Sequence, residues 1–110
     1  MNSGKRNVHF GVSVPQIKRS WEETAAAALE FERLGFDSLW VNDHLYGPQS
    51  PNIPILEAWT TCAALAAITE SCEIGTLVTP AGMRNPAHLG KIIATIDNIS
   101  RGRIIPGLGA

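Results

Sequence analysis

Cysteine and histidine are scarce in this 110-residue chain, and neither is clustered. Cys62 and Cys72 form no CxxC pair, and the first fifteen residues lack the unbroken apolar core of a signal peptide. We therefore expect a reduced, cytoplasmic protein. The three histidines, His9, His44 and His88, do not have the spacing of metal ligands, so we expect no metal site.

Long apolar runs and an excess of one charge are also lacking. Ten acidic residues stand against nine basic ones, with neither sign gathered into a block. This distribution argues against nucleic acid and anionic membranes as partners. No apolar run approaches the ~20 residues of a membrane span. The 45% hydrophobic content is that of one small globular domain.

Strand-like runs recur at regular intervals along the chain. We expect strands over residues 8–14, 38–41 and 73–78, and a fourth beginning at residue 103. Their starts are separated by 30 to 35 residues, which is the length of one strand–helix–strand unit. The pattern therefore predicts an α/β fold with a parallel sheet.

The segment after the first strand carries the signals of a helix. Ser20, followed three residues later by Glu23, has the capping-box pattern, and Gly35 supplies a C-terminal stop. Apolar residues recur between them at helical spacing. We expect a helix there, with Trp21 as a packing residue.

Two further helices are expected between the later strands. One is predicted near residues 55–69, with Pro54 in its first turn. The other begins at the Asn85–Pro86 cap and ends at Gly102. Its apolar face is expected to comprise Leu89, Ile92, Ile93, Ile96 and Ile99.

Functional groups are expected at the C-terminal ends of the strands, because the loops there face one shared crevice or barrel mouth. These ends read Pro15-Gln16, Asn42-Asp43-His44 and Thr79-Pro80. An imidazole at this position can take a proton from a bound alcohol or return one. The alternative is that Asp43 caps a loop and His44 is a solvated loop residue. Both interpretations remain open from the residues alone.

The remaining candidates are assigned no catalytic role. His9 falls inside the first expected strand as a core or sheet-face residue, and His88 lies in a helix's first turn. Trp40 and Trp59 are expected to pack in a strand and a helix. The stretch GLGA at 107–110 could begin a glycine-rich phosphate loop, but a GxGxxG pattern is not completed.

Several stretches together resemble one family. They are LGFDSLWVNDHL, IGTLVTPAGMRNPAHLGKIIATIDNISRGR and the terminal GLGA. They are similar to the N-terminal part of the luciferase-like oxidoreductases, which include flavin monooxygenases and enzymes that use the deazaflavin coenzyme F420. The resemblance implies a (β/α)₈ TIM barrel, of which residues 1–110 would be the N-terminal half, with about four strands and three helices. It also implies a ring cofactor across the C-terminal mouth, with hydride transfer to or from it.

The resemblance also implies roles for particular residues. An Asp-His pair after the second strand is a feature of the deazaflavin branch and falls on Asp43 and His44. His44 would then be the catalytic acid or base on the substrate oxygen, and Asp43 would lie against the ring. A non-prolyl cis peptide beside the ring would fall at Thr76–Leu77. The implied cofactor-binding residues are Asp43, Thr76, Leu77, Thr79 and Ala110.

The chain departs from the family pattern at two places. The sugar-phosphate dehydrogenases of this branch have an aromatic residue four positions after the Asp-His, where this chain has Pro48, which argues against a sugar phosphate as substrate. Their acidic residue after the fourth strand would lie beyond Ala110. The loops that grip the cofactor's phosphate tail also come from later in the barrel, so we expect this polypeptide alone to bind cofactor weakly or not at all.

Three functions are therefore compatible with the sequence. The first is an F420-dependent oxidoreductase, or an incomplete fragment of one, acting on a small organic molecule. The second is an FMN-dependent monooxygenase, and the third is a non-catalytic half-barrel that only assembles. Because the first and last strands would be open edges, we also expect a homo-oligomer.

Overall fold

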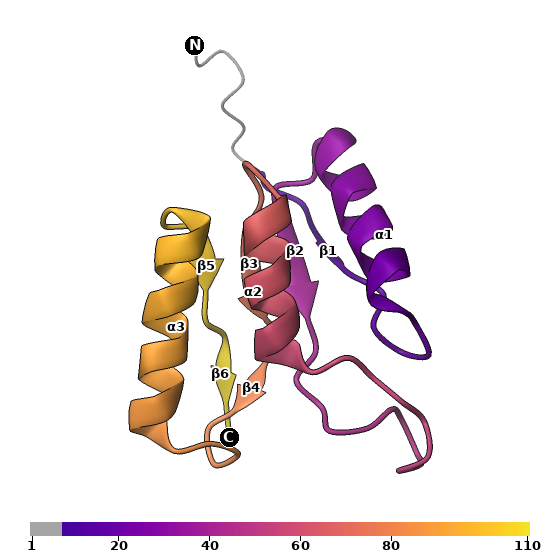
Figure 1. Ribbon diagram of the computed structural model, residues 1–110, viewed down its shortest axis with the longest axis vertical. Coiled ribbons are helices and arrows are strands. Elements are labelled where there is room, and N and C mark those ends of the chain that lie inside the picture. Colours follow the sequence, from indigo (N-terminus) through magenta and orange to yellow (C-terminus); the bar gives the residue numbers. More distant parts are fainter. Residues whose placement is uncertain (1–7) are drawn as a thin grey trace.

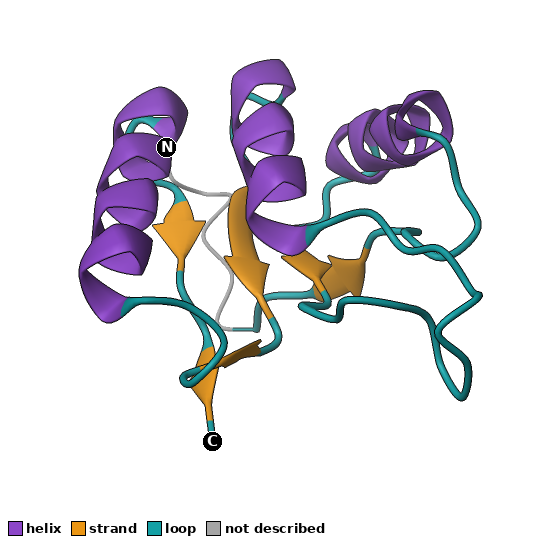
Figure 2. Cartoon of the chain, turned by 60° about the horizontal axis from the view of Figure 1, so that its bottom comes forward, coloured by secondary structure: helices purple, strands orange, loops and turns teal. Residues whose placement is uncertain are grey.

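Three helices cover one face of a four-stranded parallel sheet in this computed structural model, which describes residues 8–110 (Figures 1 and 2). The strand order is β1-β2-β3-β5, and a small second sheet pairs β4 with β6. The elements are β1 (Gly11–Ser13), α1 (Trp21–Arg33), β2 (Ser38–Val41), α2 (Ala58–Ile68), β3 (Glu73–Thr76), β4 (Thr79–Pro80), α3 (Pro86–Ser100), β5 (Ile104–Ile105) and β6 (Leu108–Gly109). The predicted parallel α/β fold is confirmed, and its strand–helix alternation is that of a partial TIM barrel.

Helices α1 and α3 begin where the capping patterns predicted. The Ser20 side chain accepts the Glu23 N–H, and the Glu23 carboxylate accepts the Ser20 N–H, which completes the capping box. The Asn85 side chain accepts the N–H groups of Ala87 and His88 at the start of α3. These local bonds satisfy N–H groups that have no partner within the helix.

Helix α2 begins later than predicted, at Ala58, so Pro54 lies outside its first turn. The Glu57 carboxylate accepts the N–H groups of Trp59 and Thr60 and thereby caps the helix at this point. Just before it, the Leu56 N–H donates to the carbonyl of Gln16, which holds the chain outside the helix.

The first strand is shorter than predicted. Strand β1 pairs only from Gly11, opposite Ser38 of β2, and the three residues before it are exposed. His9 therefore lies before the strand, exposed and 3.8 Å from the Asp37 carboxylate, rather than in the core or on the sheet face. The prediction for His9 was wrong because the Asp37 side chain already accepts the Phe10 N–H, in place of a strand partner.

The last predicted strand is divided at Pro106. Strand β5 continues the main sheet beside β3, whereas β6 pairs with β4. Proline has no N–H to donate to a ladder. After it, the Gly107 carbonyl accepts both the Thr79 N–H and the Thr76 hydroxyl. A Cβ atom at Gly107 would collide with the Thr76 carbonyl, so the close approach requires glycine.

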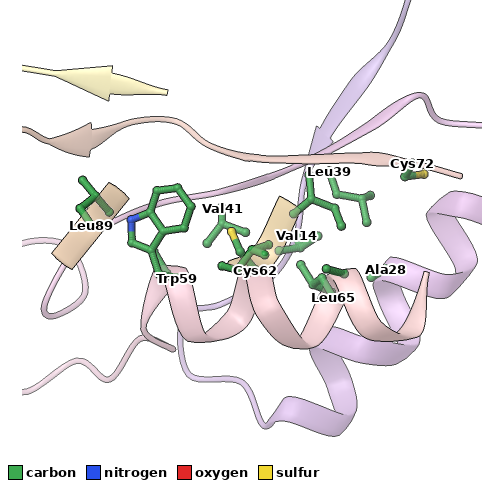
Figure 3. Close-up of a cluster of buried hydrophobic side chains, with 13 residues drawn as sticks. Val14, Ala28, Leu39, Val41, Trp59, Cys62, Leu65, Cys72 and Leu89 are labelled. Carbon is green, nitrogen blue, oxygen red and sulfur yellow. The ribbon is translucent and has the colours of Figure 1, made fainter. Parts of the chain in front are cut away.

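The core lies between the sheet and α2. Leu39 and Val41 of β2 face the helix layer, where the side chains of Trp59, Cys62 and Leu65 project from α2 toward the strands (Figure 3). All five are almost fully buried. On the opposite face of the sheet, Trp40 lies across glycines of the two neighbouring strands, Gly11 and Gly75. All three tryptophans thus have packing roles, because Trp21 also packs against the core.

Charged side chains close the other end of the sheet. The Arg103 guanidinium donates to the carbonyls of Ala66, Thr69 and Cys72 at the end of α2 and the turn into β3. The Glu32 carboxylate accepts the N–H groups of residues 70–72 in the same turn.

None of the described helices has the combination of length and hydropathy that crossing a membrane requires.

Replacing Leu39 with alanine tests whether the β2–α2 contact holds the fold together. We expect Leu39→Ala to lower the free energy of unfolding by about 3 kcal/mol. Leu39 is fully buried, so its removal both loses apolar contacts and creates a cavity. Urea titration followed by circular dichroism measures it. The exposed Leu34 supplies the control, whose alanine variant should differ from wild type by less than about 0.5 kcal/mol. Equal losses in the two variants would contradict this account of the core.

Candidate functional site

The predicted site residues lie near the C-terminal ends of the strands. The strands of the main sheet run in the same direction, so the long loop after β2 and the β4–β6 pair lie at one end of the molecule, the lower end of Figure 1. Parallel pairing of β2 with β3 places Val41 opposite Thr76. The chain segments that follow these two residues therefore leave the sheet side by side.

Asp43 is the buried centre of this end. It is 2% exposed, and both carboxylate oxygens accept hydrogen bonds. The Thr79 hydroxyl donates to Oδ2 over 2.8 Å, and the Arg84 guanidinium donates to Oδ2 over 2.6 Å and to Oδ1 over 2.9 Å. Such charge-assisted bonds in a buried setting are stronger than neutral ones. The structure thus brings Asp43 and Thr79 into direct contact.

The network extends from Asp43 to the start of α2. The Trp59 indole donates its Nε1–H to the Thr79 hydroxyl over 3.0 Å. Arg84 also donates from Nη2 to the Glu57 carboxylate over 2.7 Å. The five side chains join the loop after β2, strand β4, the segment before α3 and the first turn of α2.

The charges in this network stabilise one another. The hydrogen bond to Asp43 raises the pKa of the Arg84 guanidinium, and the bond to Glu57 raises it further. Burial by itself raises the pKa of Glu57, but bonds from Thr60, Arg84 and Trp59 outweigh burial, so the pKa of this carboxyl lies below its usual value. Glu57 is therefore ionised at neutral pH.

His44 has a different environment from its neighbour Asp43. Its side chain is exposed and lines a cavity of about 440 Å³ beside the loop after β2. The other lining residues are Ile17, Asn42, Tyr46, Gly47, Pro48, Gln49 and Ile55. The backbone just before is held by Gln16, whose side-chain amide accepts the Asn42 N–H and donates to the Asn42 carbonyl. An exposed imidazole beside a cavity is available to exchange a proton with a bound molecule.

Strand β3 ends at Thr76, two residues earlier than predicted, and the cis peptide that follows lies one position later than predicted. Thr76 is fully buried and exchanges hydrogen bonds with the backbone of Gly107. The non-prolyl cis peptide joins Leu77 to Val78, not Thr76 to Leu77. The predicted position was wrong by one peptide bond: the Leu77 N–H still donates to the Val41 carbonyl, and the cis bond follows this residue.

The outer part of this end is apolar. Leu77, Val78 and Leu108 are 55%, 42% and 59% exposed. Val78 packs beside Gly109, where a Cβ atom would lie 2.6 Å from it. Ala110 follows as an exposed residue, and it takes no part in the hydrogen bonds of Asp43.

The sequence interpretation missed Arg84 and Glu57. Arg84 precedes the Asn85 cap, and Glu57 was placed inside the predicted second helix. A signal was available for Arg84, because an arginine after the third strand falls at the same sheet end as Asp43. No comparable signal marked Glu57, whose importance depends on where α2 begins.

The two thiols and the metal-ligating residue types lie apart in the described part of the chain. Within residues 8–110 no three His, Cys, Asp or Glu side chains are grouped to hold a metal ion. Cys62 and Cys72 are free thiols, and burial raises the pKa of Cys62 to about 12, so it stays protonated.

Comparison with known proteins assigns the chain to a family. The sequence profile of the luciferase-like monooxygenase family matches residues 7–110. The chain belongs to this family. This member is 37% identical over 86 residues to an F420-dependent glucose-6-phosphate dehydrogenase of Amycolatopsis mediterranei (strain U-32), a match that covers 76% of the chain and 25% of the dehydrogenase.

Two solved structures that resemble this luciferase-like chain contain different cofactors. An F420-dependent secondary alcohol dehydrogenase, solved with an F420–acetone adduct, superposes with a TM-score of 0.80 at 28% identity, over 94% of the chain and 32% of the dehydrogenase. The oxygenating constituent of 3,6-diketocamphane monooxygenase from Pseudomonas putida, in complex with FMN, superposes with a TM-score of 0.74 at 25% identity, over 93% of the chain and 29% of the monooxygenase. The chain thus spans about a quarter to a third of these relatives.

The Glu57 carboxylate should make stability depend on acid pH. Because its pKa is lowered on folding, its contribution is present at neutral pH and is lost as the pH falls through the lowered value. We expect wild-type stability to fall more steeply than that of Glu57→Gln between about pH 5 and pH 3. Urea titrations at several pH values measure both slopes. Parallel curves for the two proteins would show that this carboxyl titrates alike in the folded and unfolded chains.

Proposed function

We propose that residues 1–110 are the N-terminal half of a luciferase-like (β/α)₈ barrel whose function is hydride transfer between coenzyme F420 and a small organic substrate. The observation that carries the proposal is that the two adjacent residues of the Asp-His pair have different environments. Asp43 is locked into a buried network, while the adjacent His44 stands exposed beside a cavity at the same end of the sheet. The similarity to F420-dependent dehydrogenases supports this cofactor.

The residues at this end fit a flat, largely apolar ring. Leu77, Val78 and Leu108 expose apolar surface beyond the sheet, and glycines at 107 and 109 keep the backbone between them free of side chains. Deazaflavin, when bound, would supply the hydride acceptor or donor. We propose that the cofactor-binding residues are Asp43, Thr76, Leu77, Thr79 and Ala110. Thr76 and Thr79 are buried, so their contribution would be to hold the backbone that meets the ring.

His44 would move the proton that accompanies hydride transfer. An imidazole can accept the hydroxyl proton of an alcohol during oxidation, or return it to a carbonyl oxygen during reduction. The cavity beside it has Tyr46 as its aromatic side chain and Pro48 at the position where the sugar-phosphate enzymes carry an aromatic residue. We therefore favour a small alcohol or carbonyl compound over a sugar phosphate as substrate.

An FMN-dependent monooxygenase is the second candidate, supported by the similarity to the FMN-bound diketocamphane enzyme. Titration of the native polypeptide with F420 and with FMN, followed by absorbance, distinguishes the two because the bound cofactors have different spectra. Binding of neither by the complete native protein that contains residues 1–110 would favour the third candidate, a non-catalytic half-barrel.

The setting of the protein is also a proposal. The two free cysteines are consistent with a reducing cytoplasm. In residues 8–110, β1 and β5 are the outer strands of the main sheet, and a second copy of the chain could pair with them in a homo-oligomer. Light scattering over a dilution series measures the assembly.

Removing the imidazole tests the catalytic assignment. We expect His44→Ala to lower turnover by about 10²-fold with a smaller effect on cofactor affinity, because acid–base catalysis acts on the transition state. Steady-state kinetics and a cofactor titration on the native polypeptide measure the two effects. His88→Ala, on the exposed side of α3, is the matched control and should retain wild-type turnover. Unchanged turnover in the His44 variant would remove this residue from the mechanism.

Removing the buried carboxylate should affect binding instead. We expect Asp43→Ala to raise the cofactor dissociation constant by about tenfold, equivalent to about 1.4 kcal/mol, because the backbone that meets the ring loses its anchor. A fluorescence titration measures it, with a thermal melt to verify folding. Asp97→Ala, an exposed site on α3, should bind as the wild type does. If the two variants bind equally well, Asp43 has no part in cofactor binding.

A further inference from the structure

We infer that Arg84 is a positioning residue that closes the base of the loop carrying His44. That loop, residues 42–57, joins β2 to α2, and its two ends are held by side chains from other parts of the sheet edge. The inference rests on the proposed function for its catalytic consequence, while the closing of the loop follows from the contacts themselves.

Arg84 bridges the two ends of the loop. Its guanidinium donates to Asp43 near the start of the loop and to Glu57 at the end. The Arg84 side chain is 15% exposed and that of Asp43 is 1% exposed, so water replaces the bonds to Asp43 poorly, whereas the Glu57 carboxylate is 46% exposed. A planar guanidinium can hold two carboxylates in one fixed geometry, whereas a lysine ammonium is a single point charge.

A second side chain bridges the same ends. The amide of Gln16, almost fully buried, donates to the carbonyls of Asn42 and Leu56 and accepts the Asn42 N–H. Gln16 comes from the segment after β1, and Arg84 from the segment before α3. The loop is therefore closed at its base from two sides, by one neutral and one charged bridge.

The position of His44 depends on these bridges. Its own side chain is exposed, and its neighbour Asp43 is the nearest residue in the chain with a buried anchor. Without Arg84, the Asp43 carboxylate would be buried with only the Thr79 hydroxyl as a side-chain donor, which is strongly unfavourable for a charge. The loop base would rearrange to hydrate the carboxylate. A displacement of about 1 Å at a catalytic group can cost about 10²-fold in rate.

Four variants of the native polypeptide test the inference. Arg84→Met removes the bridge, and Arg84→Lys keeps the positive charge without the planar guanidinium that binds two carboxylates. The double variant Arg84→Met/Asp43→Asn also removes the buried negative charge. Arg33→Met is the matched control, because Arg33 forms a similar forked pair with Glu30 on the exposed side of α1. Amide hydrogen exchange of residues 42–57, the melting temperature and turnover are measured for each.

Loss of the bridge should loosen the loop selectively. We expect Arg84→Met to accelerate exchange in 42–57 by about tenfold or more and to lower turnover by about tenfold or more, with α1 unaffected. Arg84→Lys should fall between this variant and wild type, and Arg33→Met should match wild type. If Arg84→Met does not fold, the exchange measured for Arg84→Lys decides the question. Wild-type exchange in the loop of the Arg84 variants would overturn the inference.

The double variant separates positioning from general stability. We expect its melting temperature to recover, because no buried carboxylate remains uncompensated, while amide exchange in residues 42–57 stays fast because the loop is still open. Loop exchange that returns to the wild-type rate together with the melting temperature would show that Arg84 acts through stability alone. If the wild-type protein shows no turnover of substrate with either F420 or FMN, the proposed function fails. The exchange measurement then still decides whether Arg84 closes the loop.

Discussion

The buried carboxylate of Asp43 is the constraint on which the C-terminal end of this sheet depends. A charge at 2% exposure is tolerated only when donors surround it, and here Thr79 and Arg84 supply them. Each donor belongs to a different segment, so satisfying one carboxylate places the end of β2, strand β4 and the segment before α3 relative to one another. The Trp59 and Glu57 contacts extend this order to α2.

The network also explains how two adjacent residues acquire different properties. Successive residues leaving a strand point in different directions, so Asp43 can turn inward while His44 faces the solvent. The inward-facing Asp43 side chain meets the Thr79 hydroxyl and the Arg84 guanidinium, whereas the outward-facing His44 side chain lines a cavity. A residue suited to proton exchange is thereby attached to a rigid anchor without being buried itself. This arrangement favours the catalytic interpretation of His44 over that of an ordinary solvated loop residue.

Membership of the luciferase-like family gives this geometry its setting. The relatives named above use either F420 or FMN, and both kinds superpose on the chain over more than nine-tenths of its length. The same fold therefore occurs in proteins with two different cofactors, which agrees with the general rule that a fold does not determine its reaction.

The sequence by itself determined the alternation of strands and helices, because hydrophobic period and capping residues are local properties. Ser20, Glu23 and Asn85 marked two helix starts correctly, and the 30- to 35-residue spacing implied the parallel sheet. It also placed Asp43 and Thr79 at one end of that sheet. Only the tertiary structure decided that Glu57 caps α2, that the cis bond follows Leu77, that Pro106 divides the last strand, and that Arg84 joins Asp43 to Glu57. These features depend on partners as many as 41 residues apart, and no local pattern records which distant donor will meet a buried charge.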